Sequence, residues 1–317
     1  MMWNLAYLIF ITPTIAVIFK SAFITSCIMF VDEIPEIKEK IWGYLDKIVL
    51  NEPGNEVEAA RYVALNRSAN LWRPLLTIAT ARDYGVGDLR KVISVASVVE
   101  LVHAASLIED DIADESSFRR GISSCHIKFG DNLAHLAQMY LVQKAYNLLL
   151  GDDIETNLGD GQKIAITRLA SESGIRMIKG QAKDVMQKEL GTVDDVVKMY
   201  EEKSGALIGL ALACGGIVAR AYSDVESLRK LGVAMGVSYQ IVDDALDSFA
   251  QKELIGKPVK QDGKKRTLLN LAGLNGVREL KELKDREIDR HVSELRVDST
   301  CLNVMINRLR DKHKGYI

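Results

Sequence analysis

The feature that most constrains this chain is an acidic motif, DDxxD, that occurs twice and each time closes an apolar segment. The motif occupies residues 110–114 and residues 243–247, after the apolar residues 92–108 and 231–242. On a helix, side chains four positions apart share a face, so each copy projects paired carboxylates to one side. We expect the first of these helices to end within residues 116–121, which contain two serines and a glycine.

The paired carboxylates predict a bound cation. An unpaired buried charge is very costly, so an apolar helix that projects carboxylates must provide them with a partner. Mg²⁺ is usually held by one or two carboxylates together with substrate phosphates. A single acidic cluster at a helix end needs no function. Two copies in matching contexts, however, indicate a site in which magnesium ions hold a diphosphate.

The rest of the composition predicts an almost entirely helical chain. It contains only five prolines in 317 residues, with no strand alternation and no low-complexity linker. Thr192, followed three residues later by Asp195, predicts a helix N-cap. We expect helix junctions at the glycine-containing residues 85–87, 151–153, 189–191 and 273–276.

Charge and cysteine usage limit the partners. A net charge of −2, with no basic stripe interleaved with aromatic residues, predicts no nucleic-acid partner. Five histidines are dispersed, which argues against a zinc site. The four cysteines are scattered without metal or redox spacing, which is typical of a reducing compartment such as the cytoplasm. They are Cys27, Cys125, Cys214 and Cys301.

Further motifs surround the acidic ones in a fixed order. They are RPLL at 73–76, ELVH at 100–103, RRG at 119–121, GD at 130–131, GQ at 180–181 with Asp184, KSGAL at 203–207, YQIV at 239–242, GKP at 256–258 and DGK at 262–264. In this order the chain resembles the trans-isoprenyl diphosphate synthases, or polyprenyl synthetases, from about residue 34 to about residue 283. The resemblance implies an all-α, single-domain bundle of long helices around a deep central cavity.

The resemblance also implies a reaction and a cofactor. An allylic diphosphate ionises, and its carbocation adds to the double bond of isopentenyl diphosphate, with Mg²⁺ (we expect three ions) stabilising the leaving diphosphate. Our first-choice magnesium ligands are Asp110, Asp114 and Asp243. We expect Asp111, Asp244 and Asp247 to ligate directly or through water. Because Asp111 lies about 100° around the helix from Asp110, it is also expected to act as a hydrogen-bond acceptor behind the ligands.

Cationic side chains would complete the diphosphate site. By resemblance, Arg119, Lys203 and Lys257 contact the allylic diphosphate, and Gln240 lies nearby. Ser204 stands where the family usually has threonine, and it keeps the hydroxyl. Each of these residues alone would ordinarily be a surface group, but their position beside the acidic motifs indicates function.

The isopentenyl diphosphate site departs from the family pattern. The family typically has GGKxxR before the proline, whereas residues 68–73 read SANLWR, so Asn70 replaces the lysine. Arg73, His103 and Arg120 match the remaining contacts. Losing one charge-assisted hydrogen bond costs about 1.5–3 kcal/mol, which is about one to two decades of affinity.

This departure leaves three hypotheses. The first is a chain-elongating prenyltransferase with weakened affinity for isopentenyl diphosphate. The second is a class I terpene cyclase on the same scaffold, which would keep only the ionisation machinery. The third is a non-catalytic regulatory subunit, which the two intact acidic motifs oppose. We favour elongation because Arg73, His103 and Arg120 are retained.

Product length follows from the residues just before the first acidic motif. Bulky side chains there stop chain growth early in the family, whereas Ala105 and Ser106 are small. This predicts a product of at least C20. We expect geranylgeranyl diphosphate (C20), with farnesyl diphosphate (C15) next and longer prenyl diphosphates left open. Deeper plugs could come from Val102, Met139 or Tyr140, although all of these are also plausible core residues.

The N-terminal segment, residues 1–31, differs from the expected catalytic domain, residues 32–317. Residues 5–31 are apolar except for Lys20, and they are long enough to cross a bilayer, which needs about 20 residues. Three interpretations remain open: a membrane anchor, a membrane-surface segment, or a misassigned start with Met29 as the true one. We expect a cytoplasmic protein, attached to a membrane if residues 5–31 are retained. The resemblance further implies a homodimer.

Overall fold

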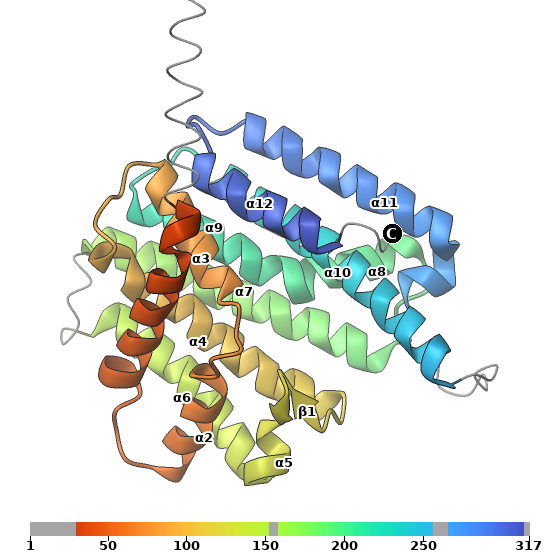
Figure 1. Ribbon diagram of the computed structural model, residues 1–317, viewed down its shortest axis with the longest axis horizontal. Coiled ribbons are helices and arrows are strands. Elements are labelled where there is room, and N and C mark those ends of the chain that lie inside the picture. Colours follow the sequence, from red (N-terminus) through yellow and green to blue (C-terminus); the bar gives the residue numbers. More distant parts are fainter. Residues whose placement is uncertain (1–29, 152–157, 256–265, 314–317) are drawn as a thin grey trace, which may run out of the picture.

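A computed structural model describes residues 30–151, 158–255 and 266–313 as helices and one short hairpin (Figure 1). A helix over residues 30–44 comes first. It is followed by η1 (Leu45–Val49), α2 (Asn55–Ala64), α3 (Trp72–Asp83), α4 (Arg90–Ala113), β1 (Phe118–Arg119), β2 (Ile122–Ser123), α5 (Cys125–Phe129), α6 (Asp131–Leu150), α7 (Asp160–Met186), α8 (Val193–Tyr200), η2 (Glu201–Gly205), α9 (Ala206–Val218), α10 (Val225–Ile255), α11 (Leu268–Ser293) and α12 (Thr300–His313).

The predicted all-α class is confirmed, and the helix junctions and the helix cap predicted on described residues are correct. Residues 85–87 and 189–191 separate successive helices, and α6 ends at Leu150, directly before Gly151; the rest of the junction expected at 151–153 lies outside the described residues. Thr192 caps α8, because its side chain accepts a hydrogen bond from the backbone N–H of Asp195. The junction expected at residues 273–276 is also correct, because Gly273 has non-helical backbone angles (φ 66°, ψ 178°) and divides α11 into two helical segments at a kink. The proposed boundary after residue 31 stays a prediction, because residues 1–29 lie outside the described ranges.

Two helices form the centre of the bundle. All thirteen residues of α9 are buried, and α9 packs against α3, α4, α7 and α10. The helix α4 is long and apolar enough to span a bilayer, but most of its apolar length is buried inside the protein. We therefore read α4 as a core helix whose acidic C-terminal end reaches the surface of the bundle.

Close helix crossings bring the second acidic motif toward the centre. A Cβ atom on Gly236 of α10 would lie 2.5 Å from the Cα of Gly205 in η2. Only glycine permits so close an approach of two backbones. This contact fixes α10 against the segment that carries Lys203 and Ser204.

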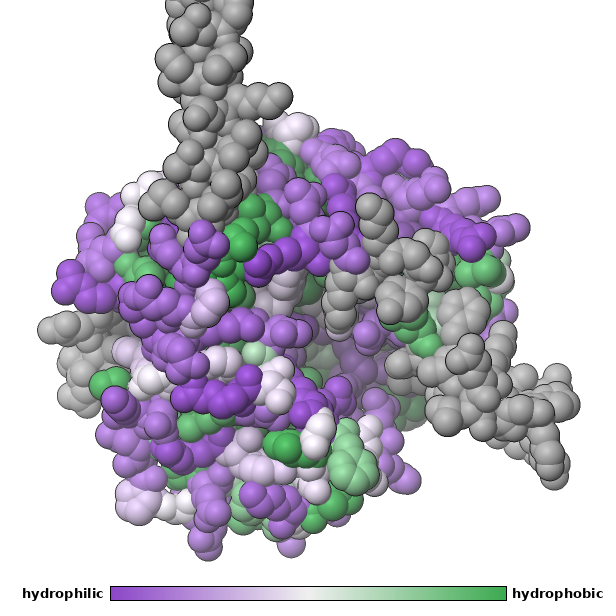
Figure 2. Space-filling view, viewed as in Figure 1, coloured by the Kyte–Doolittle hydropathy of each residue, from purple (hydrophilic) through white to green (hydrophobic). Residues whose placement is uncertain are grey.

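In the space-filling view, the face toward the reader is mostly polar and is hollowed near its centre (Figure 2).

Candidate active site

The first acidic motif lies at the C-terminal end of α4. The helix ends at Ala113, and Asp114 is the C-cap, with its N–H bonded to the carbonyl oxygen of Asp110 at 2.9 Å. The helix therefore ends before the expected residues 116–121. The predicted stacking of Asp110 and Asp114 on one turn is correct. Asp114 is exposed, whereas the side chain of Asp111 is only 4 % exposed.

A β-hairpin after α4, which was not predicted from the sequence, presents both arginines of the RRG motif. Strands β1 and β2 pair antiparallel, with Arg119 opposite Ile122. The two residues between the strands, Arg120 and Gly121, have positive φ angles of 53° and 80°. Positive φ at both positions is what a type I′ hairpin turn requires. The glycine was the available signal, but an arginine in the left-handed region is uncommon.

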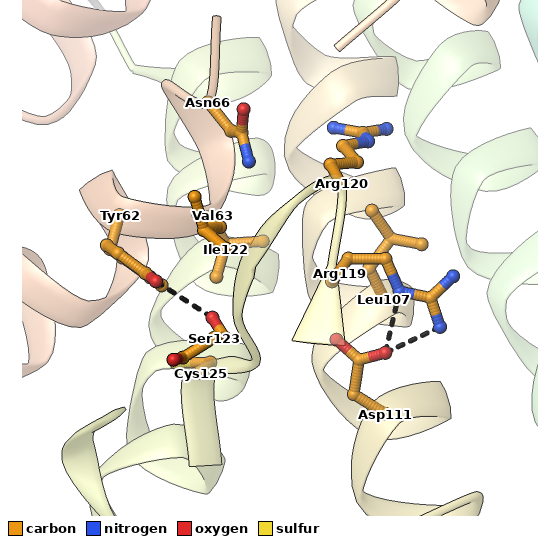
Figure 3. A pocket seen from close by; sticks show the side chains of 10 residues that line it. All are labelled: Tyr62, Val63, Asn66, Leu107, Asp111, Arg119, Arg120, Ile122, Ser123 and Cys125. Atoms are coloured by element: carbon orange, nitrogen blue, oxygen red, sulfur yellow. Dashed lines mark hydrogen bonds and ion pairs between the residues drawn. The ribbon is translucent and has the colours of Figure 1, made fainter. Parts of the chain in front are cut away.

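Arg119 turns back toward the end of α4 and pairs with the first acidic motif (Figure 3). Its Nε donates to Oδ1 of Asp111 at 2.6 Å, and its Nη2 lies 3.5 Å from Oδ2 of Asp110. Burial raises the pKa of Asp111, and Arg119 opposes that shift. Asp111 is thus already engaged by the protein, which supports its expected role as an acceptor behind the ligands.

Lys203 joins the first acidic motif to the helix that carries the GQ motif. Its Nζ lies 2.8 Å from Oδ1 of Asp110 and 2.6 Å from Oδ2 of Asp184. Although burial alone would lower the pKa of Lys203, the two carboxylates raise it, so the side chain stays charged. Asp184 follows the GQ motif in the sequence, but it was not among the residues predicted for the site.

The position of Lys203 depends on a π-helical turn and on a glycine. Lys203 lies in η2, and π-helical turns occur frequently at functional sites. A Cβ atom on Gly180 of α7 would lie 2.4 Å from the backbone nitrogen of Lys203. The glycine of the GQ motif therefore lets α7 pack directly on the η2 backbone.

The second acidic motif is held by a chain of hydrogen bonds. Ser204 Oγ donates to Oε1 of Gln240 at 2.7 Å, and Gln240 Nε2 donates to Oδ1 of Asp244 at 2.7 Å. The hydroxyl of Tyr200 donates to Oδ2 of the same carboxylate. Asp243, beside it, is half-buried. The predicted Ser204 and Gln240 thus meet as expected, and Tyr200 was not anticipated.

The described carboxylates are suited to Mg²⁺ as shared ligands. Asp110 and Asp114 offer hard oxygen atoms on one helix face, and Mg²⁺ needs only one or two carboxylates when phosphates supply the rest. Among the residues described, no three His, Cys, Asp or Glu side chains gather into a cluster that could hold an ion by themselves. The side chain of Asp247 and the whole of Lys257 lie outside the described residues, so their assignments remain predictions.

A second cationic cluster lies deeper along α4. His103 Nε2 is 3.0 Å from Nη1 of Arg73 and 3.3 Å from Nη2 of Arg120. Burial and these arginines lower the pKa of His103, so the imidazole is neutral. Glu100, one turn earlier, is 1 % exposed, and burial raises its pKa to about 7. The three predicted contacts for isopentenyl diphosphate are therefore brought together.

Several buried polar atoms of this second cluster have no hydrogen-bond partner among the described residues. They are Nε of Arg73, Nδ1 of His103 and Oε2 of Glu100. Buried polar groups are normally satisfied by protein or water, so such atoms need a partner that the protein alone does not provide. The cations are suited to an anionic ligand. Asn70, in contrast, is exposed in the loop before α3.

The residues proposed to set chain length lie on α4 between the two clusters. Ala105 is buried, and Ser106 is half-buried with its hydroxyl bonded to the carbonyl oxygen of His103 at 2.8 Å. Met139 is 63 % exposed on α6, so it is not an interior plug in this chain. Val102 and Tyr140 are partly buried against the core.

Comparisons with known proteins agree with this geometry. The family described as polyprenyl synthetase matches residues 56–298. The chain is 34% identical to geranylfarnesyl diphosphate synthase of Aeropyrum pernix, over 75% of this chain and 78% of that protein. It is 32% identical to farnesyl diphosphate synthase of Escherichia coli, over 81% and 89% of the two chains.

A solved structure shares the fold. It is a geranyltransferase from Helicobacter pylori complexed with magnesium and isoprenyl diphosphate, with a TM-score of 0.73, 23% identity, and coverage of 89% and 97%. The family match makes the chain a prenyltransferase that acts on diphosphates. The chain belongs to the polyprenyl synthetase family. It is a trans-prenyltransferase of the farnesyl and geranylgeranyl diphosphate synthase type, which condenses isopentenyl diphosphate with an allylic diphosphate.

Proposed function

We propose that this enzyme extends an allylic diphosphate to geranylgeranyl diphosphate, with farnesyl diphosphate as the next candidate product. The observation that carries the proposal is the arrangement of two separate anion sites on one helix. His103 and Asp110 are seven residues apart on α4, which places them on the same face about 10 Å apart along the axis. Two diphosphate substrates could therefore bind at the same time, one at each site.

The residues of the first site act on the allylic diphosphate. Arg119 and Lys203 already lie at Asp110, where negative charge would develop as the carbon–oxygen bond breaks. Preorganised cations that face a developing charge are usually the largest catalytic contribution. Mg²⁺, which we propose binds as three ions with the diphosphate, would supply Lewis-acid stabilisation there. Asp110, Asp114 and Asp243 are the proposed ligands.

The second site supports elongation rather than cyclisation. A cyclase folds the cation onto its own double bonds and has no use for a second diphosphate. Here Arg73 and Arg120 converge on a neutral histidine. The nearby carboxyl of Glu100 can offset at most one of the two positive charges, so the cluster is suited to a further anion. Because Asn70 stands where the family has a lysine, this site has one cation fewer than is usual in the family. Isopentenyl diphosphate is therefore proposed to bind there with reduced affinity.

The small residues Ala105 and Ser106 support a C20 product. They follow His103 on α4 and precede Asp110, so a growing chain would pass them as it leaves the reacting carbon. Neither side chain is large enough to block the fourth isoprene unit. The curated relatives include synthases of more than one chain length, so these residues carry the proposal rather than the overall similarity.

Exposed apolar residues on α6 and α7 support a homodimer. The two helices pack against each other, and large hydrophobic side chains recur on α7 at helical spacing. A second copy of this chain is the proposed occupant of the surface, because contiguous apolar patches mark association sites. Its residues are Leu136, Met139, Ile164, Ile175, Ile178 and Val185.

We further propose a cytoplasmic location for the catalytic domain, with attachment to a membrane through residues 5–31. The support is the apolar composition of that segment. Fractionation of cells that express the full chain and a chain beginning at Met29 tests this proposal. It predicts that only the full chain sediments with membranes.

Product analysis tests the proposed function. The full chain, in mild detergent with Mg²⁺, is supplied with geranyl or farnesyl diphosphate, with and without isopentenyl diphosphate. Extracts are compared before and after phosphatase treatment. A C20 alcohol that requires both isopentenyl diphosphate and phosphatase is the expected result. A hydrocarbon formed without isopentenyl diphosphate would identify a cyclase, and no product from any allylic substrate would favour the non-catalytic subunit.

A further inference from the structure

Tyr200 makes a contact that the proposed reaction does not explain by itself. It is the last residue of α8 and only 1 % exposed, and its hydroxyl donates to Oδ2 of Asp244 in the second acidic motif. A buried tyrosine hydroxyl needs a partner, and here that partner belongs to the predicted cation site.

The same short segment holds Asp244 from its other side. Ser204 follows Tyr200 by four residues and reaches Oδ1 of Asp244 through Gln240. Oδ2 of Asp244 therefore accepts from Tyr200. Oδ1 accepts from Gln240, whose side chain is in turn bonded to Ser204. Lys203, which holds Asp110, lies in the same segment. The π-helical turn η2 and its preceding residue thus connect both acidic motifs.

We propose that Tyr200 is a positioning residue for the second acidic motif, which holds the Asp244 carboxylate in the orientation needed to bind the magnesium–diphosphate complex. A phenylalanine would fill the same apolar space, so the hydroxyl has no packing function. Groups that orient metal-binding carboxylates typically contribute a factor of about 10–100 in metal affinity. The inference rests on the proposed function, because that function supplies the diphosphate and the cation.

The test is a binding measurement that does not depend on turnover. Mg²⁺-dependent binding of inorganic diphosphate is measured by calorimetry for the natural protein and for Tyr200→Phe. The expected result is about a tenfold loss of affinity for diphosphate, with little change in the free energy of unfolding. Equal or tighter binding by Tyr200→Phe overturns the inference.

A matched control separates positioning from stability. The hydroxyl of Tyr84 donates to Oδ2 of Asp224 at 2.7 Å, the same kind of bond at the C-terminal end of α3. Arg73 lies at the other end of that helix, about 16 Å away along its axis. Tyr84→Phe should lower the melting temperature and leave diphosphate binding unchanged. A parallel loss of binding in both variants would indicate a merely structural role and overturn the inference.

A double-mutant cycle tests whether Tyr200 acts through Asp244. If it does, Tyr200→Phe causes no further loss of diphosphate affinity in an Asp244→Asn background, because the two changes remove one interaction. Additive losses contradict the inference. Failure of the proposed function is distinguishable, since natural protein that binds Mg²⁺ and diphosphate without prenyl transfer leaves this result readable. Natural protein that does not bind them overturns both.

Discussion

The ammonium group of Lys203 lies between two carboxylates, 2.8 Å from Oδ1 of Asp110 and 2.6 Å from Oδ2 of Asp184. The three residues come from η2, α4 and α7, so one cation connects three elements at the site. Asp184 is 6 % exposed, and without Lys203 its charge would lose a close partner. The ion pair thus serves both the fold and the first acidic motif.

Replacing Lys203 by methionine should reduce activity and stability together. The change removes a cation at the diphosphate site and leaves two carboxylates facing each other. We expect kcat/KM to fall by about 10²–10³, and the free energy of unfolding to fall by about 3 kcal/mol. The control is Lys183→Met, which breaks another ion pair between α7 and η2, at 2.6 Å from Glu202. Similar losses of activity in both variants would contradict the assignment of Lys203.

A methyl group on Gly180 should displace the π-helical turn. Its Cβ would lie 2.4 Å from the backbone nitrogen of Lys203. We expect Gly180→Ala to lower the free energy of unfolding by about 1–3 kcal/mol and to reduce kcat through Lys203. Gly174→Ala, on the same helix with open space around it, should be neutral or stabilise by about 0.5–1 kcal/mol. Denaturant titration and steady-state kinetics measure both effects, and wild-type kcat in Gly180→Ala would refute the argument.

Restoring a cation at position 70 should strengthen isopentenyl diphosphate binding. Asn70→Lys adds one charge-assisted contact, so we expect KM for isopentenyl diphosphate to fall by about 10–100-fold. KM for the allylic substrate should stay the same. Ser68→Lys places a lysine in the same exposed loop and serves as the control. If both lysines lower KM equally, a general electrostatic effect rather than this contact is responsible.

Glu100 should give the stability of the enzyme a measurable pH dependence. Burial raises its pKa to about 7 from 4.5, with Arg120 and Arg73 opposing the shift. Because the folded state binds this proton more tightly, the contribution is fully present below pH 4.5 and is lost as the pH rises through 7. The stability of the natural protein relative to Glu100→Gln should therefore decline between about pH 5 and pH 8. Urea titrations across that range check the prediction, and a constant difference would contradict it.

A bulky side chain at Ser106 should shorten the product. Ser106 is half-buried on α4 between His103 and Asp110. Ser106→Phe would narrow the proposed path of the growing chain, so the main product should become one isoprene unit shorter. Ser106→Ala, which keeps the space open, should leave the chain length unchanged. Product alcohols separated after phosphatase treatment decide this, and an unchanged length in Ser106→Phe would refute the assignment.

Local spacing was enough to predict the elements that depend on neighbouring residues. The stacking of Asp110 over Asp114 and the cap formed by Thr192 both follow from helical periodicity, and both are correct. The family motifs, in turn, brought Arg73, His103 and Arg120 into one predicted site, and the structure places them together. These features could be predicted because each is specified by residues close together in the sequence or by an ordered motif.

Features that depend on tertiary packing were missed. Arg120 adopts a positive φ because the hairpin requires it, which residue preferences oppose. The π-helical turn that contains Lys203 packs directly against Gly180 of α7, a contact between residues far apart in the sequence. Tyr200 in an amphipathic helix resembles an ordinary core residue until Asp244 is brought to its hydroxyl. None of these relationships is encoded in local periodicity.

The most direct test of the central claim is transfer of label from radioactive isopentenyl diphosphate into an acid-labile, phosphatase-sensitive allylic prenyl diphosphate. The reaction contains the full chain, Mg²⁺ and geranyl or farnesyl diphosphate. We predict labelled product that depends on both substrates and disappears in Arg73→Met, since Arg73 belongs to the second site, which binds the labelled isopentenyl diphosphate. Unlabelled product formed from the allylic diphosphate alone would contradict the account.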